Sequence, residues 1–256
     1  MGMWEIEQFR ILRRRARFNK RTTMYTRLQW LACVLATACI VQIFLSSQVA
    51  AQDSPERFAE EIEAFEAWDR KNAWPEAPIL FVGSSSIRLW STAEAFPDLP
   101  VINRGFGGSQ ISDVNHYADR IVLKYKPRAI VFYAGDNDIA AGKSPEQVLE
   151  DFKTFVNAVR AEQPRVPIIY IAIKPSRSRW NLWSQMSQAN GMIRQYATQD
   201  PALHFADIAA PMLKTGEPPA ADLFVQDGLH LSEKGYAMWN DVLRASLREL
   251  PLASGN

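Results

Sequence analysis

The protein has only two cysteines, and both lie near its N-terminus. Cys33 and Cys39 fall inside an apolar stretch, so residues 52–256 contain no thiol. That part of the chain therefore has neither disulfide bonds nor a cysteine nucleophile. It also lacks a phosphate-binding loop pattern, and no group of its side chains has the spacing of zinc or calcium ligands. We expect a protein without a cofactor or a metal ion.

The chain also lacks a strong excess of either charge. Its formal net charge is +1 at pH 7, but the charges are distributed unevenly. Residues 1–27 carry eight basic and two acidic side chains, residues 28–51 carry neither kind, and residues 52–256 have a net charge of −5. A mildly acidic main part does not offer the basic surface that nucleic acid requires. We therefore expect no nucleic-acid partner.

The one long hydrophobic stretch lies in the N-terminal segment, residues 1–51. Residues 28–45 are uncharged, follow a basic segment, and precede the small residues Val49 and Ala51. This three-part order is typical of an export signal with those small residues at its cleavage site. A retained membrane anchor is the alternative, because the stretch approaches the length of a membrane span. Met24 is an alternative start of translation, and residues 1–23 would then be an upstream extension. The protein is thus predicted to be exported, to the periplasm or beyond, and to touch a membrane only through an uncleaved anchor.

Residues 52–256 alternate between helical and strand patterns, without internal repeats. Continuous apolar runs separated by helical patterns indicate a parallel sheet with helices on both faces. Strands are expected at residues 79–82, 101–103, 129–134, 167–173 and 203–205, and helices from 54, at 110–125, from 144, at 181–198 and at 232–250. We predict a single doubly wound α/β domain with about five strands, whose ligands bind at the carboxyl ends of the strands.

Polar residues suited to acyl transfer follow these strands. A serine nucleophile needs a base, a group that orients the base, and N–H donors for the oxyanion. Such residues occur in four segments: Gly83-Ser84-Ser85-Ser86, residues 103–109, Gly135-Asp136-Asn137-Asp138, and Asp227-Gly228-Leu229-His230. The alternative for the serines is that they only cap the next helix. For Asp136 and Asp138 we expect turn and helix-capping roles.

Three histidines compete for the role of the base. His116 follows Asp113 by three residues, opposite the apolar face of the expected helix, so we expect these two to form a solvated surface pair. His204 lies between two apolar residues of a short strand, which favours a structural position. His230 lies in a loop at the edge of the sheet where the chemistry is expected, and it is the favoured base.

Together the four segments resemble the SGNH (GDSL-like) hydrolase superfamily, in order and roughly in spacing, over about residues 77–248. The resemblance implies a flavodoxin-like sheet and an ester hydrolase. It implies that Ser85 is the nucleophile, His230 the base and Asp227 the residue that orients it, with the Ser85 N–H, the Gly108 N–H and the Asn137 amide as oxyanion donors. One position departs from the family, which usually has aspartate where this chain has Ser84. Of the three serines, Ser86 is the expected helix cap.

The loop at residues 174–183 is expected to overhang the same edge of the sheet. Its Trp180 and Trp183, together with Trp90, either bind a sugar ring or an acyl group, or they shield the core. Its Arg177 and Arg179 either meet an anionic group of the substrate or are solvated. The expected substrate is a small-molecule, glycan or lipid ester, such as an acetylated carbohydrate or a lysophospholipid. An acyltransferase and a catalytically silent glycan-binding module are the alternatives.

Overall fold

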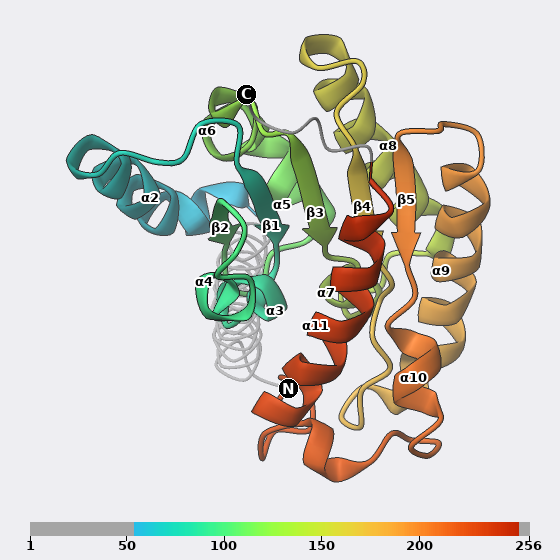
Figure 1. Ribbon diagram of the computed structural model, residues 1–256. Coiled ribbons are helices and arrows are strands. Elements are labelled where there is room, and N and C mark those ends of the chain that lie inside the picture. Colours follow the sequence, from blue (N-terminus) through green and yellow to red (C-terminus); the bar gives the residue numbers. More distant parts are fainter. Residues whose placement is uncertain (1–53, 251–256) are drawn as a thin grey trace, which may run out of the picture. The chain divides into compact units, whose positions relative to one another are not determined.

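A five-stranded parallel sheet lies at the centre of the computed structural model, which describes residues 54–250 (Figure 1). The strands are β1 (Ile79–Gly83), β2 (Val101–Gly105), β3 (Ala129–Tyr133), β4 (Ile168–Ile171) and β5 (Leu203–Ala206). Their order is β2-β1-β3-β4-β5, and every neighbouring pair is parallel. This confirms the predicted flavodoxin-like, doubly wound arrangement. The strand order reverses direction between β1 and β3, where such sheets bind their ligands.

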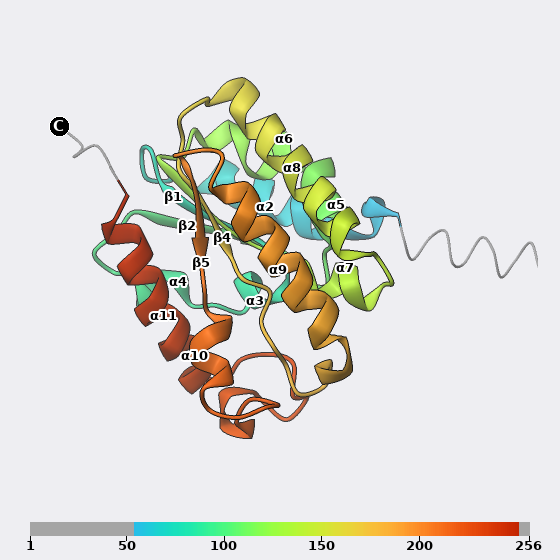
Figure 2. The same ribbon diagram turned by 90° about the vertical axis from the view of Figure 1, so that its right-hand side faces the viewer.

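Helices cover both faces of the sheet, and each face has its own hydrophobic core. Successive strand residues point to opposite faces, so Leu80 and Val82 pack into one core while Ile79 and Phe81 pack into the other. The first face is covered by α2 (Ala59–Lys71), α5 (Ile111–His116), α6 (Ala118–Ile121), α8 (Pro145–Glu162) and α9 (Trp183–Ala197). The second is covered by α3 (Ser85–Arg88), α4 (Thr92–Ala95), α10 (Ala209–Leu213) and α11 (Glu233–Arg248). Figure 2 shows α8 and α9 on one side of the sheet and α11 on the other.

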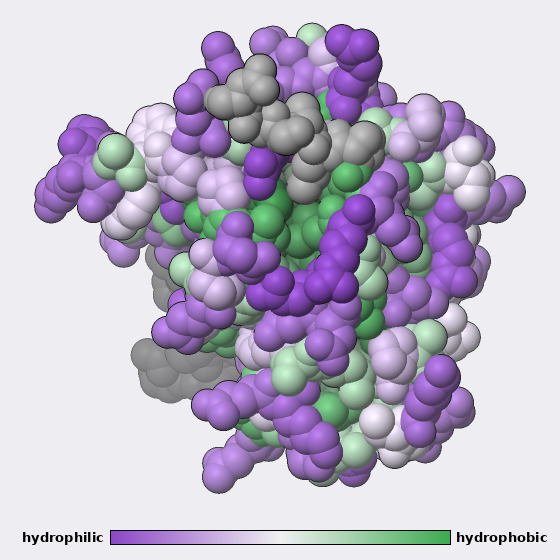
Figure 3. Space-filling view, in the orientation of Figure 1, coloured by the Kyte–Doolittle hydropathy of each residue, from purple (hydrophilic) through white to green (hydrophobic). Residues whose placement is uncertain are grey.

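Two long helices, α8 and α11, begin where their capping residues predict, whereas the helix predicted from Ser54 begins as a 3-10 turn and becomes α-helical only at Ala59. Ser144 precedes α8, and its Oγ accepts the Gln147 N–H while the Gln147 side chain accepts the Ser144 N–H. Ser232 precedes α11 in the same way, with its Oγ accepting the Gly235 N–H. The inner face of α11 is fully buried at Trp239. On the side of the protein that α11 covers, hydrophilic residues predominate and hydrophobic ones show mainly in hollows between elements (Figure 3).

The segment at residues 110–125 differs from the single helix that was predicted. It forms α5, α6 and the 3-10 turn η2 (Leu123–Tyr125), because Tyr117 and Val122 leave the helical conformation. Both side chains are buried, so packing against the sheet outweighs the continuity of the helix. The expected solvated pair is also wrong: Asp113 is buried and its carboxylate accepts the Gln110 N–H at 2.8 Å, which caps α5, while only His116 is exposed.

The beginning of the domain is a 3-10 turn, η1 (Pro55–Phe58), that leads into α2. The predicted export signal or anchor, the alternative start at Met24, the two cysteines and the predicted boundary at residues 51/52 lie outside the described residues. Within residues 54–250, no helix combines the length and the apolar character needed to cross a membrane.

Candidate active site

The turn after β1 holds Ser85 at the edge of the sheet. Gly83 has a φ of +137°, and a Cβ at this position would lie 1.8 Å from the Tyr133 carbonyl oxygen, so a larger residue does not fit. The chain then turns, and the Ser84 N–H donates to the same carbonyl at 2.9 Å. Ser84 is the N-cap residue of α3 and Ser85 is its first residue. The side chain of Ser85 is thereby presented at the carboxyl end of β1.

Ser86 does not cap the helix, contrary to the prediction. It lies inside α3, fully buried, and its Oγ accepts a hydrogen bond from Lys174 Nζ at 3.1 Å. Ser84 occupies the cap position, but its side chain makes no capping bond, and its buried Oγ has no hydrogen-bond partner within residues 54–250. The three hydroxyls therefore have three different environments, and Ser85 alone faces a histidine.

His230 and Asp227 lie in the loop between α10 and α11, within hydrogen-bond distance of Ser85. His230 Nε2 is 3.0 Å from Ser85 Oγ, and His230 Nδ1 is 2.6 Å from Asp227 Oδ2. Because a carboxylate only accepts hydrogen bonds, Nδ1 carries the hydrogen and Nε2 is free to accept one from the serine. The loop is closed by a hydrogen bond from the Val225 N–H to the His230 carbonyl at 2.9 Å. Asp227, His230 and Ser85 thus form one continuous chain.

The pKa of Asp227 is lowered to about 2. Burial acts in the opposite direction, but the hydrogen bond with His230 and the amide groups of Leu229 and His230 outweigh it. The carboxylate is therefore ionised at neutral pH and keeps the imidazole in one orientation.

Hydrogen-bond donors flank Ser85 on both sides, because β2 and β3 are the two neighbours of β1. After β2, Gly108 adopts a φ of +78°; after β3, Asn137 lies in the short helix α7 (Asp136–Ala140). The Asn137 amide ties the two segments together by donating to the Ser109 carbonyl at 3.0 Å. Within the described part of the chain, the N–H groups of Ser85 and Gly108 have no acceptor. These N–H groups are therefore free to donate hydrogen bonds to a ligand atom.

Comparison with known proteins gives one family match. Residues 88–238 match the GDSL-like Lipase/Acylhydrolase family, which is more than half of the chain. The chain belongs to this family. It is therefore a hydrolase of a family that acts on esters, as the resemblance of its sequence segments implied. A search of the curated proteins found no match.

Solved structures share the fold of this GDSL-like hydrolase at low sequence identity. A provisionally named platelet activating factor from Streptococcus pneumonia is 20% identical with a TM-score of 0.68, covering 79% of this chain and 98% of that one. A GDSL-like lipase from Bacteroides thetaiotaomicron is 18% identical (TM-score 0.63; 77% and 98% covered). A mutant of an acetyl-xylooligosaccharide esterase from Geobacillus is 15% identical (TM-score 0.57; 70% and 98% covered).

A buried ion pair lies beneath the GDSL-like site, which the sequence did not predict. Lys174 is 1% exposed, and its ammonium group donates to Asp136 at 2.7 Å, to the Tyr133 hydroxyl at 3.0 Å and to Ser86. Burial lowers the pKa of Lys174, and Asp136 partly offsets this. Burial would raise the pKa of Asp136, but Lys174 and Arg179 outweigh it and lower the pKa. The only sequence signal was a lysine directly after an apolar strand.

Asp138 also does more than stabilise its own turn. Its buried carboxylate accepts the Ile111 N–H at 3.1 Å, at the start of α5, and forms an ion pair with Lys143 at 2.9 Å. Burial raises the pKa of Asp138 to about 6, although Lys143 acts in the opposite direction. Asp138 thus links the segment after β3 to the helix that follows the Gly108 loop.

Within residues 54–250, no group of three or more His, Cys, Asp or Glu side chains is placed to hold a metal ion.

The structure places the five residues suggested for substrate binding in different environments. Trp90 is only 4% exposed and stacks on Tyr236, so it mainly belongs to the core. Trp180 and Trp183 are partly exposed and stack on each other, with ring centroids 6.3 Å apart. Neither arginine is merely solvated: Arg177 donates to the Pro219 carbonyl at 2.9 Å, and Arg179 donates to Asn137 Oδ1 at 2.9 Å.

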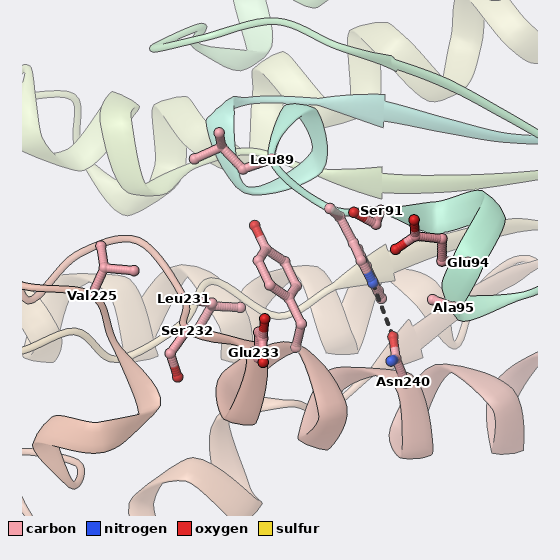
Figure 4. A pocket seen from close by; sticks show the side chains of 11 residues that line it. Leu89, Ser91, Glu94, Ala95, Val225, Leu231, Ser232, Glu233 and Asn240 are labelled. Carbon is pink, nitrogen blue, oxygen red and sulfur yellow. Dashed lines mark hydrogen bonds between the residues drawn. The ribbon is translucent and has the colours of Figure 1, made fainter.

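A pocket of about 500 Å³ lies between the α3–α4 segment and α11 (Figure 4), and its lining does not include Ser85, Asp227 or His230. One wall comes from the α3–α4 segment, and the other comes from α11 and the loop that leads into it. Two of its residues adjoin His230, since Leu231 follows it in the chain and the Val225 N–H donates to its carbonyl. The pocket contains the carboxylates of Glu94 and Glu233, and neither has a cationic partner within residues 54–250. Its lining thus combines apolar side chains with unpaired carboxylates, while the Ser232 and Tyr236 hydroxyls already donate to the Asp222 and Ser86 carbonyls.

Proposed function

We propose that this GDSL-like hydrolase cleaves carboxylic esters through an acyl-enzyme, with Ser85 as nucleophile. The observation that carries the proposal is the continuous chain from Asp227 through His230 to Ser85 Oγ. This is the arrangement that activates a serine hydroxyl, because the base is within reach of the proton and is itself oriented by a carboxylate.

In the first step, Ser85 Oγ attacks the ester carbonyl while its proton passes to His230 Nε2. The negative charge that develops on the carbonyl oxygen is stabilised by the Ser85 and Gly108 N–H groups and by the Asn137 amide. His230 then gives the proton to the departing alkoxide, which leaves as the alcohol. In the second step a water molecule loses a proton to His230 and attacks the acyl-enzyme, which releases the acid and restores Ser85. Asp227 stabilises the imidazolium that forms in both steps.

An acyl-enzyme mechanism is tested most directly by covalent labelling of the full-length protein. A fluorophosphonate probe is expected to label the wild type and the Ser84→Ala variant on Ser85, and to leave Ser85→Ala unlabelled. A wild type that folds but does not react would instead indicate the catalytically silent glycan-binding module.

For the substrate we propose a polar ester with a small acyl group, such as an acetylated carbohydrate. The pocket between α4 and α11 supports this choice, because two of its residues adjoin His230 and its unpaired carboxylates suit a hydroxyl-rich alcohol better than a long alkyl chain. One structural neighbour is named an acetyl-xylooligosaccharide esterase, which agrees with it. A panel of acetylated xylo-oligosaccharide, p-nitrophenyl acetate, p-nitrophenyl palmitate and a lysophospholipid tests this. Turnover of the last two above the first two would reverse the assignment, and a new sugar ester in the products would indicate acyl transfer.

We further propose that the enzyme is exported, as its N-terminal segment predicts. Fractionation of producing cells tests this, with the protein expected outside the cytoplasm, either free or bound to the membrane by an uncleaved anchor.

A further inference from the structure

The side-chain amide of Asn137 is hydrogen-bonded at both ends, to Arg179 at one end and to Ser109 at the other. One guanidinium nitrogen donates to Asn137 Oδ1 at 2.9 Å, while Asn137 Nδ2 donates to the Ser109 carbonyl at 3.0 Å. A guanidinium has no acceptor and a carbonyl has no donor. The two neighbours therefore permit only one orientation of the amide, with Oδ1 toward Arg179 and the NH₂ group away from it.

Arg179 is itself held in place by a buried carboxylate, that of Asp136. Its Nη1 lies 3.3 Å from Asp136 Oδ2, and that carboxylate also accepts the hydrogen bond from the buried Lys174. Lys174 in turn contacts Ser86, the neighbour of Ser85. Lys174, Asp136 and Arg179 thus form a chain of charged groups that connects α3, the helix that carries Ser85, to the Asn137 amide. The side chain of Arg179 is 21% exposed, so it is partly shielded from water.

We propose that Arg179 is a positioning residue for the oxyanion donor Asn137. This rests on the proposed function, in which Asn137 donates to the oxyanion. If the amide turned over, Oδ1 would face the negative charge and repel it. Arg179 prevents this, and by donating to Oδ1 it also polarises the NH₂ group that stabilises the oxyanion. The effect is specific to the transition state, since the charge develops only there.

Kinetics of the full-length protein with p-nitrophenyl acetate, a neutral ester, test the proposal. Arg179→Met is expected to lower kcat by about tenfold to 100-fold, below the ceiling for the loss of a whole oxyanion donor, with KM nearly unchanged. In the Asn137→Ala background the same substitution should change kcat by less than about twofold, because the group that Arg179 orients is gone. The matched control is Arg194→Met, which removes an arginine paired with Asp207 on the surface. It should leave both constants unchanged.

Three results would overturn the proposal. They are an Arg179→Met variant as active as Arg194→Met, an equal loss of kcat in both backgrounds, or a change in KM alone, which would make Arg179 a substrate contact. A wild type without esterase activity, or an Asn137→Ala variant with full kcat, would instead refute the proposed function.

A second readout does not depend on activity. In NMR spectra of the wild type, the Asn137 side-chain amide should give two separate, slowly exchanging proton signals, because both of its ends are bonded. In Arg179→Met these signals should exchange faster and approach each other, while Arg194→Met should leave them in place. Unchanged Asn137 signals in Arg179→Met would refute the positioning role even in an inactive preparation.

Discussion

Replacing Ser84, Ser85 and Ser86 by alanine, one at a time, separates three roles that are adjacent in the chain. Ser84 Oγ is buried and has no hydrogen-bond partner in the part of the chain that the structure describes, so its removal eliminates an unsatisfied polar atom. The free energy of unfolding should stay the same or rise by up to about 1 kcal/mol. Ester hydrolysis should persist, because within residues 54–250 the Ser84 hydroxyl is not hydrogen-bonded to His230 or to Asn137.

Ser86→Ala should instead lower the stability of the fold. Its Oγ accepts a hydrogen bond from the buried ammonium of Lys174, and the loss leaves one donor of a buried charge unpaired. We expect the free energy of unfolding to fall by about 1–3 kcal/mol, with hydrolysis retained in the folded fraction. Ser85→Ala should change the free energy of unfolding by about 1 kcal/mol or less and lower kcat by about 10⁴-fold to 10⁶-fold.

The assays are urea unfolding followed by tryptophan fluorescence and initial rates with p-nitrophenyl acetate. The reasoning is refuted if Ser84→Ala loses activity as Ser85→Ala does, or if Ser84→Ala and Ser86→Ala are equally destabilised. The first result would move the nucleophile by one residue, and the second would mean that the contact with Lys174 contributes nothing.

Three further predictions concern the triad and the turn that supports it. Asp227→Asn should lower kcat by about 10²-fold to 10⁴-fold, since the base loses its orienting charge, and steady-state rates at neutral pH check this. The folded-state pKa of Asp227, about 2, lies below the unfolded value, so its contribution to stability is present above the unfolded pKa and disappears as pH falls toward 2. Urea unfolding of the wild type and Asp227→Asn should therefore differ at pH 6 and converge in strong acid; a constant difference would contradict the ionised carboxylate. Gly83→Ala should destabilise the fold by more than about 3 kcal/mol because its Cβ would overlap the Tyr133 carbonyl, whereas Gly191→Ala, in open space on α9, should stabilise it by about 0.5–1 kcal/mol in thermal unfolding.

The sheet and the position of Ser85 were predictable because both are local properties of the chain. Each strand is a short apolar run, and the residue after the run is carried to the edge of the sheet. The run at Ile79 followed by Gly83 therefore predicts where Ser85 lies. Parallel strands then bring the segments of Gly108 and Asn137 together without any further information.

The buried charges were not predictable in the same way. Lys174 and Asp136 are 38 residues apart, and Arg179 meets Asn137 across 42 residues. Their pairing depends on how the segments after β3 and β4 fold over each other, which no spacing in the sequence records. The break at Tyr117 has a similar origin, because burial of that side chain against the sheet overrides a helical pattern.

The order of the strands divides the proposed catalytic residues into two groups that are held in different ways. Ser85, Gly108 and Asn137 follow three adjacent strands whose backbones are hydrogen-bonded to each other, so their spacing is tied to that of the sheet. Asp227 and His230 belong to the segment between α10 and α11, which follows the edge strand β5 and lies outside this strand-to-strand network. Insertions or deletions between α10 and α11 would therefore displace the proposed base, His230, while leaving Ser85, Gly108 and Asn137 in place. Evolutionary loss of catalysis in this architecture is expected to begin in that loop, with the rest of the cleft intact.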